Sequence, residues 1–139
     1  MRPRLLPKLT ALCLLLLPAA LTLAEDKPAV DAKPVHKSVG VDEFEKLSKG
    51  PNTVILDVRT PAEYATGHLK DAVLIDLNSK DFDQKVKALD KDKTYLVHCA
   101  VGMRSEKACK RLDTFDFPKV YNLEGGIKAW KKAGKPVEK

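Results

Sequence analysis

Short apolar segments alternate along the chain with longer segments in which apolar residues recur every three or four positions. The short segments are rich in β-branched and aromatic residues and have the length of buried strands: 53–58, 73–75, 94–99 and 119–123. The longer segments place their apolar residues on one helical face, for example Phe82, Val86 and Leu89. This alternation predicts an α/β fold, in which a small parallel sheet of about five strands is covered by helices on both faces.

Residues with strong capping preferences predict where the helices begin. Thr60, Pro61 and Glu63 form the pattern of an N-cap, a first-turn proline and a capping box, so a helix is expected to begin at Pro61. Asn78 or Ser79 is expected to cap the next helix. Further helices are predicted over 41–47, from about 104 onward and from 126 onward.

Cys99 lies at the end of the predicted strand 94–99, where parallel α/β sheets place their ligands. Only four residues separate it from Arg104, near the start of the next predicted helix. Backbone N–H groups in so tight a loop converge on its mouth, and with the helix dipole and Arg104 they favour an anion there. We therefore expect an exposed Cys99 with a thiol pKa below its usual value of about 8.5. Gly102 is expected to provide a positive φ or a close backbone approach.

The first 24 residues have the three parts of a secretory signal peptide. Basic residues come first, an apolar run over 11–17 follows, and the segment ends at Ala24. The apolar run is too short for a membrane anchor, which needs about 20 residues. We expect a periplasmic or secreted mature protein that has lost Cys13 with the peptide and has no association with the membrane.

The mature chain is expected to carry little net charge. The full sequence has 25 basic and 19 acidic residues, and removing the three basic residues of the signal peptide leaves 22 and 19. These residues are interspersed rather than clustered, which argues against nucleic-acid binding. Residues 25–37 contain two prolines and little to bury, so we interpret them as a flexible tether with a solvated His36, followed by one domain over 38–139.

Three sequence motifs span nearly all of the mature domain. They are DVRTPAEYATGHL at 57–69, CAVGMRS at 99–105 and NLEGGIKAWKKAGKPV at 122–137. Their order and their strand and helix context resemble the rhodanese family of sulfurtransferases. The resemblance implies a single-domain rhodanese-like protein with the corresponding α/β fold, and the predicted signal peptide would make it an exported form.

The resemblance also implies a two-step sulfur transfer. Cys99 would attack the outer sulfur of a donor such as thiosulfate, sulfite would leave, and a persulfide would remain on Cys99. A thiophilic acceptor, either cyanide or a thiol, would then remove the sulfur. No metal or organic cofactor is implied. The loop after Cys99 would bind the substrate and stabilise the negative charge of the persulfide: Ala100, Val101, Gly102, Met103, Arg104 and Ser105.

Two alternatives remain open at this point. The chain could be a persulfide carrier or docking module that acts on a partner protein. It could also be a phosphatase or arsenate reductase, but cysteine-dependent phosphatases, including those that share the rhodanese fold, have one more residue between the cysteine and the arginine. The shorter loop suits a single sulfur atom better than a tetrahedral oxyanion.

Four further residues match family positions in the first motif, and they are expected to form a charged network that supports the loop: Asp57, Arg59, Glu63 and His68. His98 adjoins the nucleophile in sequence. Strand alternation directs its side chain to the face opposite that of Cys99, so it is a poor candidate for a general base.

Cys109 is interpreted as a small core residue. It lies more than a helical turn beyond Arg104, too far from Cys99 for a disulfide. Cys99 would then be a single thiol outside the cytoplasm, which implies a protein reductant or acceptor in addition to small molecules.

Overall fold

The computed structural model describes residue 33 and residues 35–139 of the chain. The predicted signal peptide, 1–24, and most of the predicted tether, 25–37, lie outside the described residues. None of the helices in the described part of the chain has both the length and the apolar character that crossing a bilayer requires.

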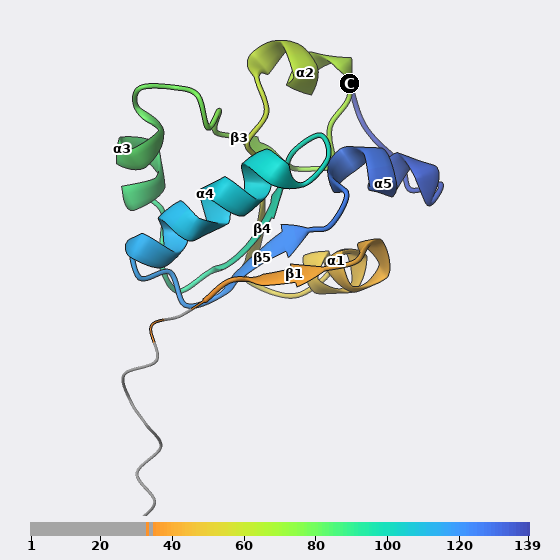
Figure 1. Ribbon diagram of the computed structural model, residues 1–139. Helices are drawn as coiled ribbons and strands as arrows, with labels where there is room; N and C mark the ends of the chain where they lie inside the picture. The colour runs from red at the N-terminus through yellow and green to blue at the C-terminus, as the bar shows by residue number, and fades with distance from the viewer. Residues whose placement is uncertain (1–32, 34) are drawn as a thin grey trace, which may run out of the picture. The chain divides into compact units, whose positions relative to one another are not determined.

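Five parallel strands form one sheet in the order β1-β5-β4-β2-β3 (Figure 1). The strands are β1 (Lys37–Val39), β2 (Thr53–Asp57), β3 (Val73–Leu74), β4 (Thr94–His98) and β5 (Val120–Leu123). All four strands predicted from the apolar segments are present. The predicted α/β fold with a parallel sheet of about five strands is therefore confirmed.

Helices lie on both faces of this sheet, as predicted, and the described part of the chain has five of them (Figure 1). They are α1 (Val41–Ser48), α2 (Pro61–Thr66), α3 (Phe82–Lys87), α4 (Met103–Thr114) and α5 (Gly126–Lys132). One hydrophobic core includes Val86 of α3 and Leu112 of α4. The other includes Phe44 of α1 and Trp130 of α5. The sheet thus separates two cores, each closed by its own pair of helices.

The central strand β4 contributes to both cores by alternation. Tyr95 and Val97 belong to the core under α3 and α4, and Leu96 belongs to the core under α1 and α5. Cys99 directly follows β4 and continues this pattern, because it lies in the same core as Val97. Pairing with β2 on one side and β5 on the other fixes the position of the end of β4.

Strand β1 and the position of His36 differ from the sequence interpretation. β1 was not predicted, and its neighbour His36 is not solvated, since only 8% of its side chain is exposed. The imidazole Nδ1 lies 2.6 Å from Asp113 Oδ2, and Nε2 lies 3.0 Å from Glu106 Oε1. Both carboxylates belong to α4, about 70 residues further along the chain. The sequence around His36 is polar and contains prolines, so nothing in it indicates that the imidazole binds carboxylates so far along the chain.

Helix α3 begins later than its predicted caps would place it. Neither Asn78 nor Ser79 is the N-cap, because the helix begins at Phe82 and Asp81 precedes it. The Phe82 N–H donates to the carbonyl of Ser79 at 3.2 Å. Residues 78–81 therefore form turns that satisfy this backbone group without a side-chain cap.

Candidate active site

The Cys99 loop joins the end of β4 to Met103, the first residue of α4. Gly102 precedes α4 with a φ of 100°, which confirms the predicted positive φ. A Cβ atom at this position would lie 3.2 Å from the backbone nitrogen of Gly125. Glycine is therefore favoured at position 102 both by its backbone conformation and by the close approach of a second loop.

Helix α5 packs its N-terminus against the same loop. Gly126 has a φ of 60°, and a Cβ atom there would lie 2.5 Å from the carbonyl oxygen of Cys99. The N–H groups of Ile127 and Lys128 donate to the carbonyls of Cys99 and Ala100 at 2.9 and 3.1 Å. The start of α5 therefore fixes the carbonyl groups at the beginning of the loop.

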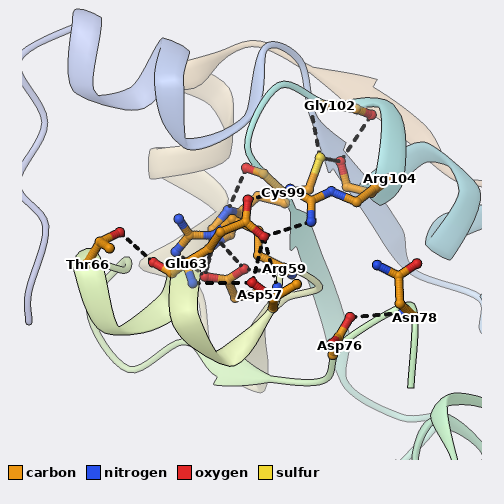
Figure 2. Close-up of polar contacts among 12 residues, drawn as sticks. Asp57, Arg59, Glu63, Thr66, Asp76, Asn78, Cys99, Gly102 and Arg104 are labelled. Atoms are coloured by element: carbon orange, nitrogen blue, oxygen red, sulfur yellow. Dashed lines mark hydrogen bonds and ion pairs between the residues drawn. The ribbon is translucent and has the colours of Figure 1, made fainter. Parts of the chain in front are cut away.

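Two hydrogen-bond donors converge on the sulfur of Cys99. The Gly102 N–H donates to Sγ at 3.1 Å (Figure 2), and the Ser105 hydroxyl donates to it at 3.4 Å. Burial raises the pKa of the Cys99 thiol, but hydrogen bonds from Ser105, Gly102 and Val101 outweigh burial and lower the pKa overall. The predicted direction of this shift is confirmed, and the loop favours a thiolate.

The expectation of an exposed thiol is wrong. Cys99 has 0% of its surface exposed, because the loop closes over the sulfur from one side and the core under α4 lies on the other. The loop instead exposes its apolar side chains: Val101 is 52% exposed and Met103 is 71% exposed. Sγ is therefore shielded from solvent in this arrangement of the loop.

Arg104 is held by Glu63 rather than left free in the loop. Its Nη1 and Nη2 atoms donate to Glu63 Oε2 and Oε1 at 2.8 and 2.6 Å (Figure 2). Glu63 Oε2 also accepts from the Thr60 N–H at 3.0 Å, which completes the predicted capping box of α2. These interactions, with that to Arg104 the largest, lower the pKa of Glu63 to about 2. The pair therefore joins the first turn of α2 to the first turn of α4.

Asp57 and Arg59 form a separate, buried ion pair beneath α2 (Figure 2). Arg59 Nη2 lies 2.6 Å from Asp57 Oδ2 and donates to the carbonyl of Gly67 at 2.7 Å. This pair anchors the end of α2 to the sheet. Asp57 itself pairs in register with His98, the residue before Cys99.

His68 does not join the charged network that the sequence predicted. Its ring stacks on Tyr64 with centroids 3.8 Å apart, and its backbone bridges to Glu138. None of the contacts described for His68 reaches the Cys99 loop. Two ion pairs thus contain the other three predicted residues, Asp57, Arg59 and Glu63. His68 instead packs at the end of α2.

His98 is fully buried on the side of the sheet that faces away from Cys99. It pairs in register with Asp57, and its Nε2 lies 3.5 Å from Asp57 Oδ2 without a hydrogen bond to any described residue. Burial lowers the pKa of its imidazole. The structure agrees with the prediction that His98 is not a base for Cys99.

Cys109 lies in the hydrophobic core beside Ala108 and Leu112, as predicted, with no exposed surface. Burial raises the pKa of its thiol, so it remains protonated. Both Cys99 and Cys109 are free thiols. Within residues 33 and 35–139, no group of three or more acidic, histidine or cysteine side chains could hold a metal ion.

Sequence reasoning missed the Glu63–Arg104 pair and the neighbouring Asp76. Asp76 follows β3; the hydrogen bonds from Arg104 to Glu63 are the main cause of the raised pKa of the guanidinium, and the charge of Asp76 adds a smaller effect in the same direction. The sequence contained one indication of this grouping: charged residues that closely follow parallel strands gather at the same edge of the sheet. The strand order β4-β2-β3 was needed to show which of them meet.

A model of the rhodanese-like domain family matches residues 40–133, which is more than half of the chain. The chain belongs to the rhodanese family. The fold, a five-stranded parallel sheet with helices on both faces, is likewise that of solved rhodanese domains. The sequence resemblance to this family is confirmed.

Other rhodanese-family proteins resemble the chain over most of their length. A Bacillus subtilis (strain 168) protein named "Putative sulfurtransferase YtwF" is 41% identical over 92 residues, 66% of this chain and 86% of that protein. A sulfurtransferase of Allochromatium vinosum is 32% identical over 93 residues, 67% of this chain and 85% of that protein. The crystal structure of a rhodanese-related protein from Thermoplasma volcanium has a TM-score of 0.66 and 32% identity, and the match covers 74% of this chain and 98% of that one.

Some relatives contain a similar region within a longer protein. The tRNA uridine(34) hydroxylase of Cytophaga hutchinsonii is 42% identical over 88 residues, 61% of this chain but only 28% of that protein. The rhodanese family and the sulfurtransferase relatives support a sulfurtransferase-type enzyme.

Proposed function

We propose that this rhodanese is a sulfurtransferase that carries sulfane sulfur on Cys99 as a persulfide. The observation that supports this function is the convergence of the Gly102 N–H and the Ser105 hydroxyl on Cys99 Sγ. Donors placed around one sulfur atom stabilise the attacking thiolate and, after transfer, the negative charge of the persulfide.

In the first half-reaction the Cys99 thiolate attacks the outer sulfur of a donor such as thiosulfate. A bond forms between Sγ and this sulfur, the donor's sulfur–sulfur bond breaks, and its electron pair leaves with sulfite. The products are a Cys99 persulfide anion and the sulfite dianion, so charge and atoms balance without an added oxidant or reductant.

In the second half-reaction an acceptor attacks the outer sulfur of the persulfide. Cyanide would give thiocyanate, and a thiolate would give a new persulfide, while the Cys99 thiolate is regenerated in both cases. The loop 100–105 has to open for each transfer, because Cys99 has no exposed surface in the closed arrangement.

A phosphatase or arsenate reductase is disfavoured by the position of Arg104. Such an enzyme needs its arginine to bind a tetrahedral oxyanion beside the cysteine. Here both terminal nitrogens of the Arg104 guanidinium donate to Glu63, at 2.6 and 2.8 Å.

The open alternative is a persulfide carrier or docking module that gives its sulfur to a partner protein. We further propose that the chain acts in the periplasm or outside the cell, after removal of residues 1–24.

Incubation of the purified protein with thiosulfate and cyanide tests the proposed reaction. Multiple turnovers of thiocyanate formation are expected, with loss of activity in Cys99→Ala and retention in Cys109→Ala. Intact mass should increase by about 32, the mass of one sulfur atom in the persulfide, and cyanide should reverse the gain.

Loading of Cys99 without turnover would favour the carrier over the enzyme. Failure of Cys99 to take up sulfur from thiosulfate and from inorganic polysulfide would overturn both. A gain in mass that persists in Cys99→Ala would place the sulfur on another residue and would also reject the proposal.

A further inference from the structure

A cavity of about 570 Å³ opens beside the first half of strand β2. Its wall is formed by the end of α1, by residues 53–55 of β2, by residues 69–71 and 73, by Trp130 of α5 and by Pro136. None of these lining residues belongs to the loop 99–105. Residues 53–55 pair with the first three residues of β4, whereas Cys99 follows the last residue of β4. The cavity is therefore separate from the candidate active site.

The short strand β3 explains why β2 is open at this point. β3 pairs with Leu56 and Asp57, so residues 53–55 have β4 on one side and no strand among the described residues on the other. Burial follows the same boundary, because residues 53–55 are partly buried while Leu56 and Asp57 are buried. A strand edge without a neighbour presents backbone N–H and C=O groups to whatever occupies the space beside it.

Apolar side chains form much of the cavity wall. Ile55, Leu69 and Trp130 also take part in the core under α1 and α5, and Val73 is 45% exposed. The Trp130 indole Nε1 donates to the carbonyl of Pro136 at 2.9 Å. With this hydrogen engaged, the indole contributes an apolar aromatic surface. A largely apolar wall with few polar groups, enclosing a volume of this size, is typical of small-molecule sites.

The charged groups of the lining give it one net positive charge, from Lys49, Lys70 and Asp71. Lys49 Nζ lies 3.7 Å from Glu45 Oε1, but Glu45 is bound more closely by Lys135, at 2.6 Å. The exposed Lys70 makes no ion pair with a described residue. The lining therefore provides two ammonium groups for an anion beside an apolar wall.

We propose that this cavity is a binding site for a small carboxylate with an apolar, aromatic body. The body packs against Trp130 and Val73, and the carboxylate binds Lys70 and Lys49. A small molecule is favoured over a peptide, because an open edge of three residues is shorter than a typical strand and offers little backbone pairing. This binding activity goes beyond sulfur transfer and does not depend on it.

The experiment titrates the isotope-labelled full chain with three probes that share one carbon skeleton: phenylbutyrate, phenylbutanol and phenylbutylamine. NMR follows the backbone N–H resonances and the indole N–H of Trp130, which is the one tryptophan of the chain. Phenylbutyrate should shift the resonances of Trp130, Ile55 and Lys70 in a saturable way, with a dissociation constant on the order of 1 mM for so small a ligand. Phenylbutanol should bind about threefold more weakly, and phenylbutylamine more weakly still.

Lys70→Gln tests the contribution of charge. It should weaken phenylbutyrate binding about threefold, as expected for one exposed ionic contact, and should leave phenylbutanol binding unchanged. Lys107→Gln is the matched control, because Lys107 is exposed on α4, which packs on the core at the other face of the sheet. This control should leave the binding of all three probes unchanged.

The inference is overturned if phenylbutyrate causes no saturable shift of the Trp130 indole, or if the shifts centre on Gly102 and Ser105, which would place the probe at the Cys99 loop. Equal or tighter binding of the alcohol or the amine would reject the preference for a carboxylate. Equal effects of Lys70→Gln and Lys107→Gln would reject the role of Lys70. Cavity resonances that shift with protein concentration alone would indicate that a second copy of the chain covers this face, which also contradicts the proposal.

Discussion

The Ser105 hydroxyl can influence the ionisation of the Cys99 thiol. Its oxygen lies 3.1 Å from the Gly102 carbonyl and 3.4 Å from Cys99 Sγ, and it has no exposed surface. A hydroxyl carries a single hydrogen, so it can donate to only one of these acceptors at a time. When Cys99 is ionised, the thiolate attracts this hydrogen more strongly than the neutral carbonyl does.

Replacing Ser105 by alanine should raise the pKa of the Cys99 thiol by about one unit, since a hydrogen bond to a charged group contributes roughly 1.5 kcal/mol. The measurement is the pH dependence of Cys99 alkylation by iodoacetamide, followed by intact mass. The midpoint should move to higher pH in Ser105→Ala. Ser48→Ala removes a hydroxyl that bonds within α1 and should leave the midpoint unchanged. A midpoint that does not move in Ser105→Ala would show that the backbone donors alone set the pKa.

At the scale of elements, Glu63 connects two helices that follow neighbouring strands. α2 begins shortly after β2, α4 begins shortly after β4, and β2 pairs with β4. Glu63 caps α2 through Thr60 and binds Arg104 in the first turn of α4. The same carboxylate therefore sets the start of α2 and holds the Cys99 loop.

Glu63→Gln should lower the free energy of unfolding by about 1 kcal/mol near neutral pH, the contribution of a part-exposed bidentate pair. The folded-state pKa of Glu63, about 2, lies below its unfolded value of 4.5, so the stabilisation is present above pH 4.5 and is lost as the pH falls toward 2. Urea unfolding of both proteins at pH 7 and pH 3 should show a smaller difference at the lower pH.

Glu43→Gln provides the control for this effect. Glu43 occupies the same third position of α1 that Glu63 occupies in α2, but it is exposed and makes no ion pair with a described residue. Its replacement should change stability little at either pH. An equal loss of stability in both variants would assign the effect to the helix dipole rather than to Arg104.

Helices and strands could be predicted from the sequence where the residues that specify them are close together along the chain. Thr60, Pro61 and Glu63 lie within one helical turn, and the capping box formed as expected. β1 could not be predicted, because it has three residues and is held by its pairing with β5, more than 80 residues away. The boundary of α3 was misplaced because Asn78 and Ser79 are equally suitable in turns and at helix caps.

The candidate site was predictable to a similar extent. Cys99, the positive φ of Gly102 and the direction of the thiol pKa follow from a strand that turns directly into a helix. The burial of Cys99 and the partner of Arg104 depend on how α2, α4 and α5 approach one another in space. Glu63 is 41 residues from Arg104, so no local pattern links them.

At the scale of the whole molecule, hydrogen bonds from His36 hold the beginning of the described domain against α4. Its ring nitrogens face Asp113 and Glu106, its backbone N–H donates to Asp113 Oδ1 at 3.0 Å, and Lys110 lies 3.8 Å from Glu106. Both ring nitrogens can donate only when the imidazole is protonated. Burial lowers the pKa of His36, but the hydrogen bonds to the two carboxylates outweigh burial and raise the pKa overall.

This raised pKa predicts that stability falls as the solution becomes basic. The contribution of His36 is fully present below its unfolded pKa of 6.5 and is lost as the pH rises through the higher folded-state pKa. His36→Gln should therefore lower the free energy of unfolding by about 1–2 kcal/mol at pH 5.5, and by much less at pH 9. Urea unfolding of the full chain at the two pH values measures the difference.

His68→Gln separates this effect from the general loss of an imidazole, because His68 stacks on Tyr64 and makes no contact with a carboxylate side chain among the described residues. The difference in stability between wild type and His68→Gln should be nearly the same at both pH values. A His36→Gln deficit that stays constant or grows toward pH 9 would mean that His36 acts through packing or as a neutral hydrogen-bonding group. In that case His36 would attach the segment before β1 to α4 independently of pH. The protonated form of its imidazole would then have no special role in holding β1, the edge strand, against α4.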